Sequence, residues 1–249
     1  MAPADRPQLI VATDADALAR MAAERVMAQI SANPGRIAIC LTGGSSPALL
    51  YRQLGSDAYR DKIPWARVHW FIGDERFVAE SDPLNNMTVA REIFLNHNAP
   101  PANIHPIPTT TEGPDASAEA YARELQSFYG AADLDPARPL FDLVLMGAGP
   151  DGHTASLFPD YPALDETEHW VVGVPKANVA PFVPRVTLTL PALASCREML
   201  FEMAGPPKRA ILTRLLNGEN LPALRARSMG ETVWLVDEAA LPEGFGGGR

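Results

Sequence analysis

The sequence contains little cysteine. Its 249 residues include two cysteines, Cys40 and Cys196, which are too few for a framework of disulfide bonds and lack the spacing of metal ligands. Cys40 lies within an apolar run that is typical of a strand. We therefore expect both residues to be buried thiols in a reducing compartment, and we expect no metal site.

Positive charge is also scarce, and long apolar runs are missing. The 21 basic and 30 acidic residues give a net charge of −9, which disfavours a nucleic-acid binder that relies on attraction to phosphates. Any anionic ligand must be held by a few local groups. No run approaches the roughly 18 apolar residues of a membrane-spanning helix, and the N-terminus MAPADRPQLIVATD has no apolar segment like that of a signal peptide. We expect a cytoplasmic protein that binds neither nucleic acid nor membrane.

Short apolar runs alternate with longer amphipathic stretches along the chain. This alternation is typical of βα units and a mostly parallel sheet. Helices are predicted where apolar residues recur at i, i+3 and i+4, at 14–30, 47–55 and 118–131, and strands at 36–41, 68–72, 141–146, 170–174, 186–190, 198–203 and 232–236. We see no domain boundary or repeat. We expect a single α/β domain over 1–249 with a disordered tail from about residue 243.

Open α/β sheets bind ligands where the strands end, and the first loop of interest there is LTGGSSPALLY. A strand leads into Thr42, Gly43, Gly44 and Ser45, and Pro47 then suits the first turn of a helix. Two glycines let the backbone approach a ligand, and free N–H groups at a helix N-terminus favour a phosphate or carboxylate. The alternative is an ordinary turn with a serine N-cap.

The second loop is WFIGDERFVAESDPLNN, where a strand ends in three consecutive charged residues. Asp74, Glu75 and Arg76 could mark the point at which the strand leaves the core, because charge runs usually form solvated faces. Alternatively, Arg76 supplies one of the local cations that an anionic ligand requires. Asn85 and Asn86 follow close behind.

The third loop, MGAGPDGHTASLF, contains the spacing of a dinucleotide-binding fingerprint. That fingerprint usually occupies the first βα turn, whereas this loop begins at Gly147 after at least two earlier units. It also requires an acidic residue after the next strand, but WVVGV is followed by Pro175 and Lys176. Asp151 would place a carboxylate where the pyrophosphate belongs. An NAD enzyme is therefore disfavoured, and no other cofactor is indicated.

The same loop presents a histidine beside a carboxylate. Asp151 can orient the ring of His153 and raise its basicity, which is an arrangement suited to a general base. A helix is expected to start at 154–156. The other four histidines, His69, His97, His105 and His169, have no comparable surroundings in the sequence, and we expect them to be structural or surface residues.

Four stretches together resemble the 6-phosphogluconolactonase family: LTGGSSPALLY, WFIGDERFV with NN after it, LVLMGAGPDGHTASLFP and PRVTLTLPAL. The resemblance implies a Rossmann-like α/β fold with helices on both faces of a mostly parallel sheet. It implies hydrolysis of 6-phospho-D-glucono-1,5-lactone without a cofactor, with His153 as the base that activates water. Ser46 and Asn85 depart from the family pattern, which commonly has threonine and serine there.

The resemblance also implies a phosphate clamp of two basic residues and the first glycine loop. Lactone hydrolysis further needs donors for the oxyanion, and Arg76 is a candidate. We expect catalysis by His153, Asp151 and Arg76, and substrate binding by Thr42, Gly43, Gly44, Ser45, Asp74, Asn86, Gly149, Arg185 and Lys208. A glucosamine-6-phosphate deaminase and a non-catalytic sugar-phosphate-binding regulator remain alternatives. The sequence leaves monomer and homodimer open.

Overall fold

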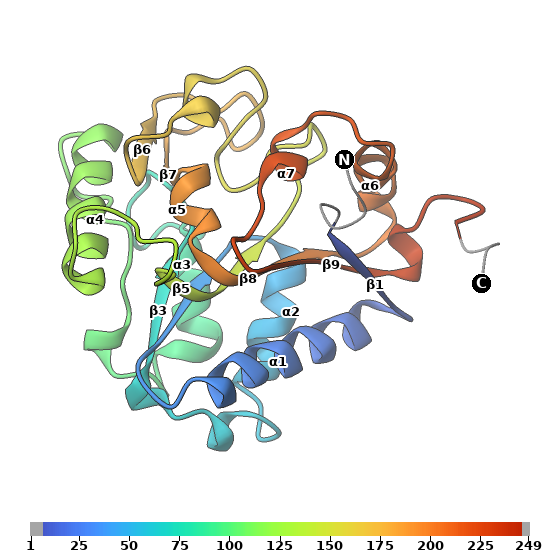
Figure 1. Ribbon diagram of the computed structural model, residues 1–249, viewed down its shortest axis with the longest axis horizontal. Coiled ribbons are helices and arrows are strands. Elements are labelled where there is room, and N and C mark those ends of the chain that lie inside the picture. The colour runs from blue at the N-terminus through green and yellow to red at the C-terminus, as the bar shows by residue number, and fades with distance from the viewer. Residues whose placement is uncertain (1–6, 246–249) are drawn as a thin grey trace.

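A parallel sheet of six strands forms the centre of the computed structural model, which describes residues 7–245 (Figure 1). Its strand order is β1-β9-β8-β5-β2-β3, and each neighbouring pair is parallel. The strands are β1 (Gln8–Ala12), β2 (Ile37–Leu41), β3 (Val68–Ile72), β5 (Phe141–Met146), β8 (Cys196–Met203) and β9 (Glu231–Asp237). The predicted mostly parallel α/β fold is confirmed, and β1 is a strand that the sequence analysis missed.

A second, antiparallel sheet contains β4 (Asp74–Arg76), β7 (Arg185–Leu188) and β6 (Val171–Val174), in that order. We predicted β7 and β6 as strands of the mostly parallel sheet. They are strands, but the expectation that they belong to that sheet is wrong. Only the ten residues 175–184 connect them, and a parallel pair needs a crossover of about a dozen residues or more. This sheet lies above the end of the parallel sheet in Figure 1.

The three predicted helices are present. They are α1 (Ala15–Ala32), α2 (Ser45–Leu54) and α4 (Pro114–Tyr129), which begins four residues before its predicted start at 118. The Asp14 side chain caps α1 by accepting a hydrogen bond from the Ala17 N–H (2.7 Å). Helices α1 and α2 cover one side of the parallel sheet, and α4 packs on the second sheet (Figure 1).

The remaining helical segments are short. They are α3 (Asn86–Ala90), the π-helical turn η4 (Arg91–Leu95), α5 (Leu190–Ala194), α6 (Arg209–Leu216), α7 (Pro222–Arg225) and the 3₁₀ turns η2 (Arg60–Lys62), η3 (Trp65–Arg67), η5 (Pro101–Asn103), η6 (Pro162–Asp165), η7 (Pro206–Lys208) and η8 (Glu238–Ala240). Helices α5 and α7 lie on the side of the parallel sheet opposite α1 and α2 (Figure 1). Among residues 7–245, no helix is long and apolar enough to cross a membrane.

Most of the core is one cluster of buried apolar side chains that joins both sheets to the helices, and Phe158, Val174 and Ala177 form a small second cluster. Cys40 and Cys196 belong to the main cluster as free, buried thiols, as expected. Of the tail predicted to be disordered, residues 243–245 form a turn in which the Phe245 N–H donates to the Pro242 carbonyl (3.1 Å). The remaining tail residues lie outside the described part of the chain.

Candidate active site

A cavity of about 180 Å³ opens where the C-terminal ends of β2, β3, β5 and β8 approach the second sheet. Ten of the twelve predicted site residues line it, namely Thr42, Gly43, Gly44, Asp74, Arg76, Asn86, Gly149, His153, Arg185 and Lys208, together with Gly147, Ala148 and Ala155. The two predicted residues outside the lining are Ser45 and Asp151. Residues far apart in the chain therefore converge on one site, as an open α/β sheet favours.

The first wall of the cavity is the glycine loop before α2. Gly44 is the N-cap, with φ of +121°, and no side chain caps the helix. The alternative of a serine-capped turn is therefore wrong, because Ser45 is an exposed first residue of the helix. The Tyr51 hydroxyl holds the loop by accepting from the Thr42 N–H (3.1 Å) and donating to the Thr42 carbonyl (2.6 Å). The uncapped N–H groups favour an anion.

Asn86 connects this glycine loop to the charged second loop. A Cβ at Gly43 would overlap the Asn86 side-chain amide, so glycine is required for the close approach. The amide nitrogen of Asn86 donates to the Asp74 carbonyl (3.1 Å). Its oxygen accepts from Arg76 Nη1 (2.8 Å), which also donates to the Leu84 carbonyl (2.8 Å). The Arg76 guanidinium is thereby fixed, with its buried Nε left without a partner among residues 7–245.

The charge run at 74–76 is not a solvated face, because Asp74 and Glu75 are both buried. Pairing of β4 with β7 draws the run into the second sheet. The Glu75 carboxylate accepts from the N–H groups of Arg76 (2.8 Å), Asn86 (2.7 Å) and Met87 (2.9 Å). Burial nevertheless raises the pKa of Glu75 to about 7. Glu75 thus supports the start of α3 and does not line the cavity.

Asp74 does line the cavity. Two hydroxyl residues that the sequence analysis did not predict for the site, Ser156 and Thr187, form a chain of hydrogen bonds with it. Its Oδ2 accepts a hydrogen bond from Ser156 Oγ (2.7 Å). The Ser156 N–H in turn donates to Thr187 Oγ1 (3.2 Å) on β7. The one feature of the sequence that could have indicated Ser156 is its position three residues after His153 in the same motif. Pairing with β7 could not be read from the motif.

His153 and Asp151 form the predicted pair. His153 Nδ1 lies 2.5 Å from Asp151 Oδ1, which also accepts from the His153 N–H (3.2 Å). Burial acts to raise the pKa of Asp151, but its hydrogen bond to His153 and the charge interaction outweigh this and lower it. A carboxylate at Nδ1 assigns the proton to that nitrogen, which leaves the Nε2 lone pair free. Asp151 therefore lies behind the ring that lines the cavity.

The glycines of this loop shape the position of the imidazole. A Cβ at Gly149 would overlap the His153 ring, and the Gly149 N–H donates to the His153 carbonyl (2.8 Å). Gly152 has φ of +91°, a left-handed conformation that favours glycine. The predicted helix at 154–156 is wrong, because Thr154 bridges to Leu157 and Ala155 has φ of +48°. The turn therefore continues past His153.

Three cations reach the cavity in a chain that is acidic as a whole. Arg185, 4% exposed on β7, donates through Nη2 to the Pro181 carbonyl (2.8 Å), and its buried Nε has no partner among residues 7–245. Lys208 in η7 donates to the Ala148 carbonyl (2.7 Å). Burial lowers the pKa of both Arg185 and Lys208. With Arg76, they give the cavity the local positive charge that a phosphorylated ligand requires.

The other histidines lie outside this cavity. His97 and His169 are exposed, as expected. His105 also has a carboxylate partner, since its Nδ1 lies 2.6 Å from Glu124 Oε1, and its Nε2 lies 2.9 Å from His69 Nδ1. The exposed ring of His169 lies 3.2 Å from Glu166. Burial lowers the pKa of His69 to about 4. No group of three or more metal-ligating side chains is present in the described ranges.

Comparison with known proteins agrees with this geometry. A family model for glucosamine-6-phosphate isomerases/6-phosphogluconolactonase matches residues 13–234. A 6-phosphogluconolactonase from Streptomyces coelicolor is 38% identical, with 95% of this chain and 94% of that protein covered. The crystal structure of a 6-phosphogluconolactonase from Thermotoga maritima has a TM-score of 0.79 at 29% identity, covering 94% of this chain and 100% of that one.

A monomeric glucosamine-6-phosphate deaminase has the same fold, with a TM-score of 0.79 at 18% identity over 94% of this chain and 98% of that one. Fold alone therefore does not separate the two activities. The family model spans most of the sequence, and the sequence relatives named as lactonases cover nearly all of it. The chain belongs to the glucosamine-6-phosphate isomerase/6-phosphogluconolactonase family.

Proposed function

We propose that the protein hydrolyses 6-phospho-D-glucono-1,5-lactone to 6-phospho-D-gluconate. The observation that carries the proposal is the contact of His153 Nδ1 with Asp151 Oδ1 (2.5 Å) at a cavity that also contains Arg76, Arg185 and Lys208. A base and a set of cations in one small cavity match an electrophilic carbonyl in a phosphorylated ligand. The relatives described above are named 6-phosphogluconolactonase, which is the enzyme that catalyses this reaction.

In the proposed mechanism, Nε2 of His153 takes a proton from a water molecule as the water oxygen attacks C1 of the lactone. The C1 carbonyl electrons move onto its oxygen, and the resulting oxyanion is stabilised by hydrogen-bond donors. Arg76, fixed by Asn86 and Leu84 with its Nε unpaired, is the donor that we assign. The C1–ring oxygen bond then breaks, and the imidazolium of His153 returns the proton to the ring oxygen. Asp151 stabilises the imidazolium throughout.

The phosphate is assigned to the uncapped start of α2 together with Lys208 and Arg185. The N-terminal N–H groups of a helix carry partial positive charge, and in the described chain no side-chain hydrogen bond caps those of α2. Lys208 and Arg185 provide full positive charges that are partly desolvated by burial. Asp74, held by Ser156, is placed to accept hydrogen bonds from sugar hydroxyls.

A deaminase is less well supported than a lactonase. It would need a carboxylate as the base, and Asp74 and Glu75 are the candidates. Glu75 is bound by three backbone N–H groups and does not line the cavity, and one oxygen of Asp74 is engaged by Ser156. A non-catalytic regulator would bind the sugar phosphate without needing a histidine oriented by a carboxylate. We further propose that the protein acts in the cytoplasm, where its two free thiols stay reduced.

The deciding experiment is a lactonase assay on freshly generated substrate, corrected for spontaneous ring opening. We expect release of 6-phosphogluconate well above the rate with the His153→Asn variant, and no ammonia from glucosamine 6-phosphate. Ammonia release would support the deaminase. Binding of 6-phosphogluconate with no acceleration of ring opening would support the regulator, and either result would overturn the proposal.

A further inference from the structure

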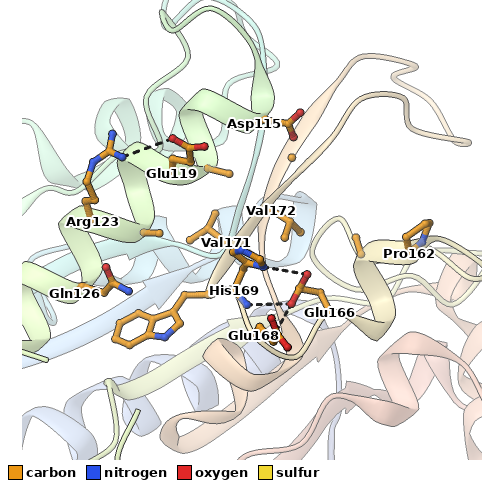
Figure 2. A pocket seen from close by; sticks show the side chains of 15 residues that line it. Asp115, Glu119, Arg123, Gln126, Pro162, Glu166, Glu168, His169, Val171 and Val172 are labelled. Atoms are coloured by element: carbon orange, nitrogen blue, oxygen red, sulfur yellow. Dashed lines mark hydrogen bonds and ion pairs between the residues drawn. The ribbon is translucent and has the colours of Figure 1, made fainter. Parts of the chain in front are cut away.

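A second, wider groove lies away from the candidate active site. It has a volume of about 600 Å³ and runs between α4 and the segment 162–169, with β6 along it. Figure 2 shows Glu119, Arg123 and Gln126 on α4 facing Glu166 on the opposite wall, with the β6 strand between them. None of its lining residues lines the catalytic cavity, so the proposed reaction does not explain it.

The strand in this groove has a free edge. Among the strands of residues 7–245, β6 is the end strand of the second sheet and pairs only with β7. Val171 stands opposite Leu188, whose N–H points the other way and donates to the Gly73 carbonyl (2.8 Å). The next pair outward, Trp170 with Thr189, is hydrogen-bonded (3.0 Å). Because hydrogen-bonded and open pairs alternate in an antiparallel ladder, Val171 and Gly173 direct their N–H and C=O groups away from β7.

These outward groups have no hydrogen-bond partner among residues 7–245, and they lie at the floor of the groove, with Val171 4% exposed and Gly173 half-buried. Trp170 and the first three residues of β6 line the groove consecutively, although side chains of a strand alternate between its two faces. The groove therefore follows the strand edge itself. An unpaired edge is a template for another strand, and four residues of strand offer a length of about 13 Å.

The charge of the groove restricts what can pair there. Four carboxylates line it, from Asp115, Glu119, Glu166 and Glu168, against the single guanidinium of Arg123 and the imidazole of His169. Arg123 lies 3.7 Å from Glu119, and His169 lies 3.2 Å from Glu166. Asp115 and Glu168 have no cationic partner in the described chain. A second copy of this acidic chain, with its net charge of −9, is disfavoured by repulsion.

We propose that this groove binds an extended, basic segment of a partner protein, which adds to β6 as a fourth strand. Its backbone pairs with the outward groups of Val171 and Gly173, and lysine or arginine side chains meet the carboxylates on the two walls. Such strand addition draws its affinity from main-chain hydrogen bonds and its specificity from the side chains beside the edge. The surface is separate from the catalytic cavity, so occupation leaves the lactonase site open.

The probe is a blocked peptide of alternating lysine and valine, about eight residues long, which is within the usual length of a strand. Titration into the full-length, ¹⁵N-labelled protein should shift the amide resonances of Val171 and Gly173, and calorimetry should give one site. Alternate N-methylation of the peptide removes its donors and should abolish binding. A glutamate and valine peptide should not bind.

Variants test whether the groove is the site. Glu119→Lys with Glu168→Lys, both at exposed positions, should weaken the lysine peptide about tenfold or more, which corresponds to about 1.4 kcal/mol. The matched control, Asp57→Lys with Asp61→Lys, changes the net charge equally at exposed positions outside the groove. Both variants should keep the wild-type lactonase activity.

Three outcomes would overturn the proposal. The first is the absence of shifts at Val171 and Gly173, and the second is equal affinity in the groove variant and its control. The third is a dimer in sedimentation whose interface includes β6, because the occupant would then be a second copy of this chain.

Discussion

The imidazole of His153 lies against the backbone of Gly149, so closely that a Cβ at position 149 would overlap the ring. Gly149→Ala should therefore displace the base, and misplacement of a catalytic group by about 1 Å can cost about 10²-fold. We expect a fall of that order in kcat. Gly113→Ala is the control, because a Cβ there meets nothing within 4 Å and Gly113 lies outside the cavity. Equal effects of the two substitutions on kcat would contradict the assigned role of Gly149.

His153 itself should carry the proton transfer. His153→Asn is expected to lower kcat by about 10²–10⁴, the usual contribution of a positioned base, with little change in product affinity. Asp151→Asn should lower kcat as well, because it replaces the carboxylate 2.5 Å from Nδ1 with a neutral amide, which neither stabilises the imidazolium nor enforces one tautomer.

The same base predicts a pH dependence. The wild-type kcat/KM should fall on acidification, because protonated imidazole cannot accept a proton from water. The His153→Asn variant should lose this inflection. Near-normal turnover with an unchanged acidic limb would place the base elsewhere, with Asp74 the first candidate.

Lys208 is predicted to bind the substrate phosphate. Lys208→Ala should weaken binding of 6-phosphogluconate by about 10- to 150-fold, the equivalent of a charge-assisted contact of about 1.5–3 kcal/mol. Arg185→Ala should act in the same direction. Unphosphorylated gluconolactone lacks the recognised group and should be affected much less. Comparable losses for both ligands, measured by calorimetry and by inhibition, would rule out a phosphate contact.

Tyr51 is expected to fix the anion-binding loop. Tyr51→Phe removes the hydroxyl that pairs with both backbone groups of Thr42, and leaving buried polar groups unpaired costs about 1–3 kcal/mol. Urea denaturation should show a loss of that size, and KM should rise more than kcat falls. A variant that is destabilised but has wild-type KM would show that Tyr51 acts on the fold alone.

Glu202 should make stability depend on pH. This residue of β8 is 1% exposed, and neither carboxyl oxygen has a partner in the described chain. Burial raises its pKa from 4.5 to about 8. Because the folded state binds the proton more tightly, the associated stability is fully present below pH 4.5 and is lost as the pH rises through about 8.

Glu202→Gln keeps the shape without the charge, so denaturation curves measured across the window from pH 4.5 to about 8 should differ less than in the wild type. Glu243→Gln, at a 92% exposed side chain, is the control. An unchanged pH slope in Glu202→Gln would assign the titration to another group.

The sequence by itself determined which residues can perform the chemistry. Glycines in two strand-end loops and a histidine two residues after an aspartate are local patterns, and the parallel sheet follows from the alternation of strands and helices. Because the C-terminal ends of parallel strands meet at one edge, loops predicted separately converge on one cavity. The contact of Asp151 with His153 needed only a separation of two positions in the chain.

Only the tertiary structure decided which polar residues are buried and which strands are antiparallel. The run Asp74 to Arg76 looks the same in the sequence whether it leaves the core or, as found, pairs with β7. Ser156 meets Asp74 across 82 positions of chain. The edge of β6 that faces away from β7 likewise exists only because no other described strand pairs with it. Burial and strand partnership depend on long-range contacts, and a local pattern of residue types is compatible with more than one set of them.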